Sequence, residues 1–221
     1  LVGGQKLSKT MAGEGAVRLT DIAPQSLTAE YGVDPVRYYL LRDTPLGTDG
    51  DFSLEGIIAR YNTDLANNLG NLVARVATVV GSKCGGVSPA SRDESPLRSE
   101  AATAVAASAT AWESFAPHAA LEATWRLIGA TNAYLEQHAP WKMEPGASVD
   151  AVMGDALEAL RIITVLIVPA MPSTAQEIWR RLGLPGDVRD VGLAATSWGG
   201  FPVGATVTKG DPLFPRISAN L

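Results

Sequence analysis

The sequence contains very little cysteine and histidine, and this scarcity excludes several kinds of site. Cys84 is the only cysteine among 221 residues, so no disulfide can form within the chain. The two histidines, His118 and His138, are far from it in sequence, and no spacing typical of a zinc site is present. We therefore expect no metal site in this chain, and a reducing, cytoplasmic setting.

Long apolar runs and an excess of positive charge are also missing. The most apolar run, residues 162–170, is too short to cross a bilayer, which requires about 20 residues. The N-terminal residues lack the order of a signal peptide. The net charge of −5 argues against a protein that coats nucleic acid by bulk electrostatics, so any RNA contact must depend on particular residues. With 46% hydrophobic residues, we expect a soluble globular protein outside the membrane.

What the sequence does contain is apolar residues at helical spacing. From residue 54 to residue 80 they recur at steps of three and four, which predicts one long helix with Ser53 as its N-cap and Gly81 as its end. Ser173 and Gln176 have capping-box spacing ahead of another short helix. Other helices are predicted at residues 26–31, 35–42, 100–115, 120–137 and 151–168. The last of these is apolar nearly all round at its end, which is typical of an enclosed central helix.

These elements predict a mainly α-helical fold. Residues 53–183 are expected to form an antiparallel helix bundle, and residues 1–52 a small mixed connector in front of it. Residues 184–221, rich in Gly and Pro, are expected to form a tail that packs on a surface.

A glycine-rich stretch near the start contains Lys6-Leu7-Ser8-Lys9-Thr10. Its spacing is not that of a Walker phosphate-binding loop. A solvated basic turn is one interpretation of such a short segment. The segment also resembles the K-M-S-K-S loop of class I aminoacyl-tRNA synthetases, with Leu7 and Thr10 in place of Met and Ser. That loop stabilises the triphosphate of ATP while the amino acid attacks the α-phosphate.

Further segments extend the resemblance over almost the whole chain. They are GVDPVRYYLL at 32–41, DGDFS at 49–53, RYNTDLANNLGNL at 60–72, APWK at 139–142 and PLFPRI at 212–217. In this order they resemble methionyl-tRNA synthetase. The H-x-G-H motif of that family's nucleotide-binding α/β domain is absent, and it would precede Leu1. The resemblance therefore implies the C-terminal part of a larger enzyme, with the α/β domain outside this chain.

The resemblance also implies roles for particular residues. Lys6 and Lys9 would be the catalytic residues, and together with Ser8 and Thr10 they would bind ATP, which acts with Mg²⁺ in the full enzyme. The full enzyme would activate methionine and attach it to tRNA(Met). We expect a monomer whose partners are this tRNA and the N-terminal catalytic domain.

Three residues match the family's anticodon-binding positions. Asn71 and Arg75 are four residues apart and share one helical face, where the alternative is a solvated flank of the core stripe. Trp141 follows Pro140 between two helices, where a large aromatic is either a lid on the core or a platform for an RNA base. An amide, a guanidinium and an indole suit the edges and faces of splayed RNA bases. The remaining tryptophans are expected to be packing or surface residues.

The resemblance thus implies a methionine–tRNA ligase whose ATP-phosphate loop and anticodon-binding domain are present here. Two alternatives remain open at this stage. One is a fragment of another class I synthetase, which would bind a different tRNA. The other is a non-catalytic tRNA-binding module derived from a synthetase.

Overall fold

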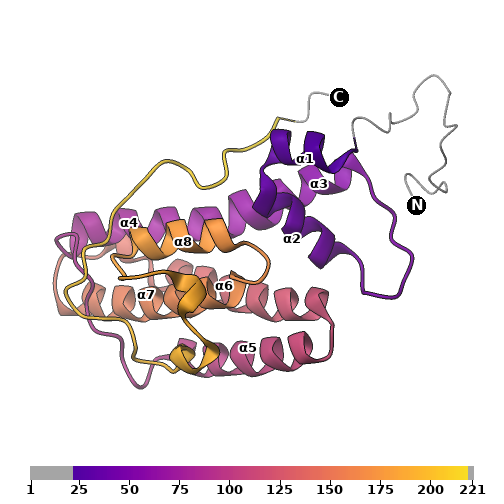
Figure 1. The fold of residues 1–221 in the computed structure, drawn as a ribbon. Helices are drawn as coiled ribbons and strands as arrows, with labels where there is room; N and C mark the ends of the chain where they lie inside the picture. The colour runs from indigo at the N-terminus through magenta and orange to yellow at the C-terminus, as the bar shows by residue number, and fades with distance from the viewer. Residues whose placement is uncertain (1–21, 219–221) are drawn as a thin grey trace, which may run out of the picture.

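The computed structural model describes residues 22–218. Within these residues the fold is mainly helical, as predicted, and its helices form an antiparallel bundle beside a smaller helical lobe (Figure 1). The α-helices are α1 (Pro24–Tyr31), α2 (Val33–Asp43), α3 (Leu54–Arg60), α4 (Asn71–Lys83), α5 (Pro96–Glu113), α6 (Pro117–His138), α7 (Ala147–Ile167) and α8 (Pro172–Arg181). Short 3₁₀ turns are η2 (Pro140–Lys142), η3 (Val188–Asp190) and η4 (Leu193–Thr196).

The predicted long helix is present, but its middle turns are wider than those of an α-helix. α3 continues without a break into the π-helical segment η1 (Tyr61–Gly70) and then into α4. Ser53 is the N-cap, as expected, and its side chain accepts a 2.9 Å hydrogen bond from Gly56 N. A Cβ atom at Gly70 would lie 3.0 Å from the carbonyl oxygen of Leu65, so the wide turn favours glycine there. Such segments frequently occur at functional sites in helices.

The helix ends differ from the predictions by a few residues. Gly81 does not end the long helix, which continues to Lys83 with Cys84 as its C-cap, because a single glycine costs only about 1 kcal/mol inside a helix. The three helices that follow also begin three or four residues earlier than predicted, two of them at a proline. Proline suits the first turn of a helix, where its missing N–H would have no partner.

α7 lies at the centre of the bundle. Every residue from Val152 to Ile167 is buried, which confirms the enclosed helix that its apolar circumference predicted. α4, α5, α6 and α8 all pack against it. The core therefore surrounds α7, and the outer faces of α4 and α6 are left for other contacts.

The capping box predicted for α8 is wrong. The helix begins at Pro172, before Ser173, and the Asp34 carboxylate of α2 accepts a 2.6 Å hydrogen bond from the Thr174 backbone N–H. Arg37 of α2 donates to the carbonyl oxygens of Pro169 and Ala170 at 2.8 and 2.9 Å. The cap of α8 thus comes from the distant helix α2 and not from its own first residues. The same bonds attach α2, which belongs to the predicted connector, to the bundle.

The C-terminal tail has no long helix in the part of the chain that the structure describes. Its first part is held by the buried Glu158 carboxylate, which accepts from the backbone N–H groups of residues 199, 200 and 201. Its last part, residues 208–217, is here called the C-terminal strap and is the yellow segment in Figure 1. The strap runs antiparallel to the long helix, because Arg216 bonds Asn67 and Ile217 bonds Asn62.

Candidate nucleic-acid interface

The four residues predicted to bind ATP, Lys6, Ser8, Lys9 and Thr10, lie outside the described residues. The three predicted anticodon-binding residues lie inside them, and two of these are in direct contact. The guanidinium carbon of Arg75 lies 4.6 Å from the centroid of the Trp141 ring. The same guanidinium forms a 2.8 Å ion pair with Glu136 of α6. The structure therefore brings together side chains from α4, α6 and η2.

A sharp turn after α6 places Trp141. Ala139 has the left-handed backbone conformation, with φ of 45°, and its N–H still donates to the Leu135 carbonyl at 2.9 Å. The Lys142 N–H then donates back to the Ala139 carbonyl at 2.8 Å. Left-handed backbone is unfavourable for alanine and tends to persist where surrounding structure enforces it. Pro140 is buried at this turn, so the indole is carried on a rigid support.

The exposure of Trp141 separates the two interpretations of this residue. It is 37% exposed, whereas Trp125 and Trp179 are only 8% and 6% exposed. The Trp125 indole packs on Tyr38, with ring centroids 4.4 Å apart, so of the two expected roles, packing or surface, it has the packing role. Trp141 is therefore not a lid buried over the core, and its ring is accessible from solvent.

Asn71 lies one helical turn before Arg75 and is exposed. Because both residues belong to the regular part of the helix, the spacing of four places them on one face, as predicted. No hydrogen bond within the described residues engages the Asn71 side chain. Its amide is thus available to a ligand.

The other polar residues of this helix face have internal partners. Asp64 accepts from Tyr38 Oη at 2.8 Å and pairs with Arg60 at 3.2 Å. Asn68 accepts a 2.9 Å hydrogen bond from Asn132 of α6. The polar edge expected from the sequence therefore divides into an internal part, which joins helices, and an outer part at Asn71.

Glu136 was not among the candidate residues, although it contacts one of them. Its side chain is 65% exposed, and its pairing with Arg75 follows from the packing of α6 beside α4. No spacing in the sequence relates two residues on different helices. Only the fold shows that a carboxylate competes for the Arg75 guanidinium.

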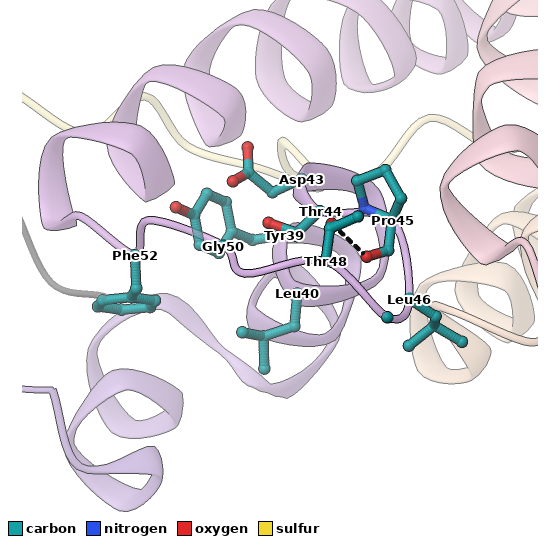
Figure 2. Close-up of a pocket in the computed structure, with 10 residues that line it drawn as sticks. Tyr39, Leu40, Asp43, Thr44, Pro45, Leu46, Thr48, Gly50 and Phe52 are labelled. Carbon is teal, nitrogen blue, oxygen red and sulfur yellow. Dashed lines mark hydrogen bonds between the residues drawn. The ribbon is translucent and has the colours of Figure 1, made fainter. Parts of the chain in front are cut away.

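A separate pocket of about 370 Å³ lies between the end of α2 and the loop that follows it (Figure 2). Tyr39, Leu40 and Phe52 contribute to its lining, and Thr48 donates a 2.7 Å hydrogen bond to the Pro45 carbonyl at its rim. Asp43 is the carboxylate among its lining residues, and it pairs with Arg60 at 3.1 Å. The described lining therefore offers no pair of acid and base groups for catalysis.

Cys84 has no environment that would activate it. Burial and a hydrogen bond with Asp150 raise the pKa of its thiol to about 12, so the reactive thiolate is disfavoured near neutral pH. Among the described residues, no three histidine, cysteine or acidic side chains are placed to hold a metal ion together. No helix among residues 22–218 is both long enough and apolar enough to cross a membrane. Asn71 and Trp141 are exposed, and the Arg75 side chain beside them is 20% exposed; these three residues form the best candidate site of the described chain.

Comparison with protein families gives two adjoining matches. A family model described as tRNA synthetases class I (M) matches residues 1–77. A second, described as the anticodon binding domain of methionyl tRNA ligase, matches residues 86–220. Asn71 and Arg75 fall within the first match and Trp141 within the second.

Individual relatives of this chain are named methionine–tRNA ligase. The methionine–tRNA ligase of Streptomyces coelicolor is 39% identical over 232 residues, which cover 98% of this chain and 42% of the relative. That of Enterococcus faecalis is 36% identical over 206 residues, covering 89% of this chain and 30% of the relative. The chain thus spans less than half the length of these relatives.

Solved structures agree with this result. The free form of Mycobacterium tuberculosis methionyl-tRNA synthetase matches with a TM-score of 0.76 at 32% identity, over 89% of this chain and 41% of that chain. The same organism's enzyme in complex with methionyl-adenylate matches with a TM-score of 0.77 at 34% identity, over 88% and 40%.

Proposed function

The chain belongs to the methionyl-tRNA synthetases of class I, and from this premise we propose that residues 53–183 bind the anticodon of tRNA(Met). Asn71 and Arg75 hydrogen-bond the edges of anticodon bases, and Trp141 stacks on one of them. The observation that supports this best is the contact between the Arg75 guanidinium and the Trp141 ring, because it places a hydrogen-bond donor beside an aromatic side chain that is 37% exposed.

The proposal extends to the reaction of the whole enzyme. Such an enzyme forms methionyl-adenylate from methionine and ATP with Mg²⁺ and transfers the methionyl group to tRNA(Met). Lys6 and Lys9, with Ser8 and Thr10, would stabilise the phosphates, while a nucleotide-binding domain supplies the methionine pocket. Residues 1–52 would connect the two and contact the tRNA stem. We place the enzyme in the cytoplasm, which the unpaired Cys84 supports, and we expect it to be a monomer.

RNA binding by the 221-residue chain tests the anticodon assignment. A hairpin carrying the CAU loop is expected to bind more tightly than hairpins with a replaced loop. Arg75→Ala and Trp141→Ala should each weaken CAU binding by about 1 to 3 kcal/mol, since a stacked base contributes about that much. Arg98→Ala and Trp112→Ala on α5 are matched controls that should leave affinity unchanged.

Equal affinity for all loops would contradict anticodon recognition by this domain. Preference for the anticodon of a different tRNA would instead indicate another class I synthetase. If the CAU preference persists without Arg75 and Trp141, the domain assignment stands and the two residue assignments are wrong.

A further inference from the structure

A groove of about 610 Å³ runs between the long helix and the C-terminal strap. On one side it is lined by Asn67, Gly70 and Asn71, and on the other by Lys209, Phe214 and Arg216. Asn71 belongs both to this groove and to the proposed anticodon site. The groove is therefore continuous with that site.

The helical period fixes how the groove relates to Arg75. A residue four positions after Asn71 lies about 40° around the helix axis in one direction, and a residue three positions after it lies about 60° around in the other direction. Arg75, with Trp141, thus lies on one side of Asn71, and Ala74 and Gly70, which line the groove, lie on the other. Asn71 is flanked by the aromatic platform on one side and by the strap on the other.

The charged residues that line the groove are both basic. Lys209 and Arg216 are both exposed, and no carboxylate is among the lining residues. Asp211 is near Lys209 in sequence but does not line the groove. No ion pair or hydrogen bond within the described residues engages the Lys209 side chain, so its charge has no internal partner there.

The strap is held at both ends, so its backbone and the Arg216 guanidinium are fixed in position beside the helix. Thr208 N donates to the Arg181 carbonyl at 2.8 Å, and the Arg181 guanidinium donates to the Asp211 carbonyl at 2.7 Å. At the other end, Arg216 donates two hydrogen bonds to Asn67 Oδ1 at 3.0 and 2.8 Å. Between them Phe214 is buried against Tyr61. Groups that are already ordered lose less entropy when a ligand binds.

We propose that this groove holds the sugar-phosphate backbone next to the anticodon, with Lys209 and Arg216 contacting its phosphates. The proposal rests on the anticodon function proposed above. In a chain with a net charge of −5, RNA affinity requires local cations, and these two line the same groove as Asn71, the residue that would contact a base. Phosphate contacts fix the position of an RNA without selecting its sequence, so the strap contributes affinity, while Asn71, Arg75 and Trp141 contribute selectivity.

The test measures affinity for the CAU hairpin and for a loop-replaced hairpin at several salt concentrations, using the 221-residue chain. Lys209→Gln and Arg216→Gln should each weaken the binding of both RNAs by the same factor, about fivefold. Each should also reduce the magnitude of the slope of log K against log salt by about 0.7 to 0.9. The ratio of affinities for the two loops should not change. Arg98→Gln on α5 removes an equal charge away from the groove and should change neither quantity.

Two further variants separate charge from structure. Arg216→Lys loses the paired bonds to Asn67 but keeps the cation, so it should retain the wild-type salt slope. Lys209→Gln should melt at the wild-type temperature because its side chain has no partner in the described chain. A loss of affinity that follows the melting temperature instead of the charge would overturn the proposal.

The results distinguish this proposal from the one on which it rests. If wild-type protein prefers CAU but the groove variants bind with unchanged affinity and slope, RNA does not enter the groove and the anticodon function stands. If wild-type protein shows no loop preference and the groove variants still lower the slope, the groove holds RNA and the anticodon assignment fails. RNA binding unaffected by all groove variants would leave the groove to another occupant, such as a protein segment.

Discussion

The guanidinium carbon of Arg75 lies 4.6 Å from the centre of the Trp141 ring, so these two proposed anticodon-binding residues contact each other before RNA arrives. A cation–π contact contributes about 0.5 to 1 kcal/mol at an exposed site and about 2 kcal/mol when desolvated, and the Arg75 side chain is 20% exposed. Glu136 also holds the same guanidinium, at 2.8 Å. An RNA base must therefore share or replace partners that Arg75 already has.

Glu136→Gln is expected to strengthen binding of the CAU hairpin. The change removes a competitor for Arg75 and a negative charge near the RNA. Exposed ion pairs contribute about 0.2 to 1 kcal/mol, which corresponds to an affinity gain of up to about fivefold. Glu122→Gln is a matched control on the same helix, because Glu122 pairs with Arg42 at 3.9 Å, away from Trp141. Weaker binding by Glu136→Gln would mean that the carboxylate positions Arg75 for RNA.

Trp141→Ala should leave the folded state nearly as stable as wild type. The residue is 37% exposed, so little core packing is lost when it is truncated. Trp125→Ala removes an indole that is 8% exposed and that bonds the Asp64 carbonyl, and it should cost about 3 to 5 kcal/mol. Urea unfolding of both variants measures the difference. A similar cost for the two would identify Trp141 as a structural residue.

Local sequence patterns predicted the helices better than they predicted the contacts between them. The core stripe of the long helix and the apolar circumference of α7 follow from periodicity, so both elements were found. The cap of α8 was wrong because it comes from Asp34, and no local rule describes a partner from a distant helix. The wide turns of η1 were not foreseen either, since a π-helical segment has no simple pattern of residue types.

The candidate site shows the same division. Family resemblance identified Asn71, Arg75 and Trp141, and the spacing of the first two correctly placed them on one helical face. The exposure of Trp141 could not be derived from sequence, because it depends on the turn at Ala139 and on neighbouring helices. The strap cations were missed for a similar reason: the motif containing Arg216 was recognised, but only the fold places it beside Asn67.

In the full-length enzyme, Lys6→Ala or Lys9→Ala should slow adenylate formation by about a hundredfold or more. The reason is lost stabilisation of phosphate charge, while tRNA affinity should remain nearly unchanged. Pyrophosphate exchange measures the first quantity and filter binding the second. Lys83→Ala, at the end of α4, is the control and should affect neither. Normal exchange in both loop variants would show that a loop with Leu7 and Thr10 has lost the family role.

The 221-residue chain alone should not catalyse pyrophosphate exchange, because the H-x-G-H motif of the nucleotide-binding domain is absent from it. Adding ATP and methionine to purified chain tests this directly. Exchange above the level of a Lys6→Ala, Lys9→Ala double variant would contradict the prediction.

The contact between α8 and the strap is expected to depend on pH. Glu177 accepts hydrogen bonds from Arg180 and Arg181, and these lower the pKa of its carboxyl to about 2. The ordinary value is 4.5, so the folded state binds this proton less readily than the unfolded chain does. Stability from Glu177 is therefore fully present above pH 4.5 and is lost as the pH falls through about 2.

Glu177→Gln should accordingly be less stable than wild type at pH 7, by up to about 1 kcal/mol because the carboxylate is partly exposed. The difference should shrink below pH 4.5 and disappear near pH 2. Because Arg181 also bonds the Asp211 carbonyl, the variant should loosen the strap, and trypsin should cleave after the exposed Lys209 faster than in wild type. Asp187→Asn removes a carboxylate whose pKa Arg189 lowers to about 2, but that pair does not contact the strap. Faster cleavage in both variants would mean that the strap responds to general destabilisation and not to Arg181. A stability difference between Glu177→Gln and wild type that stays constant from pH 7 to pH 3 would rule out titration of Glu177 as its cause.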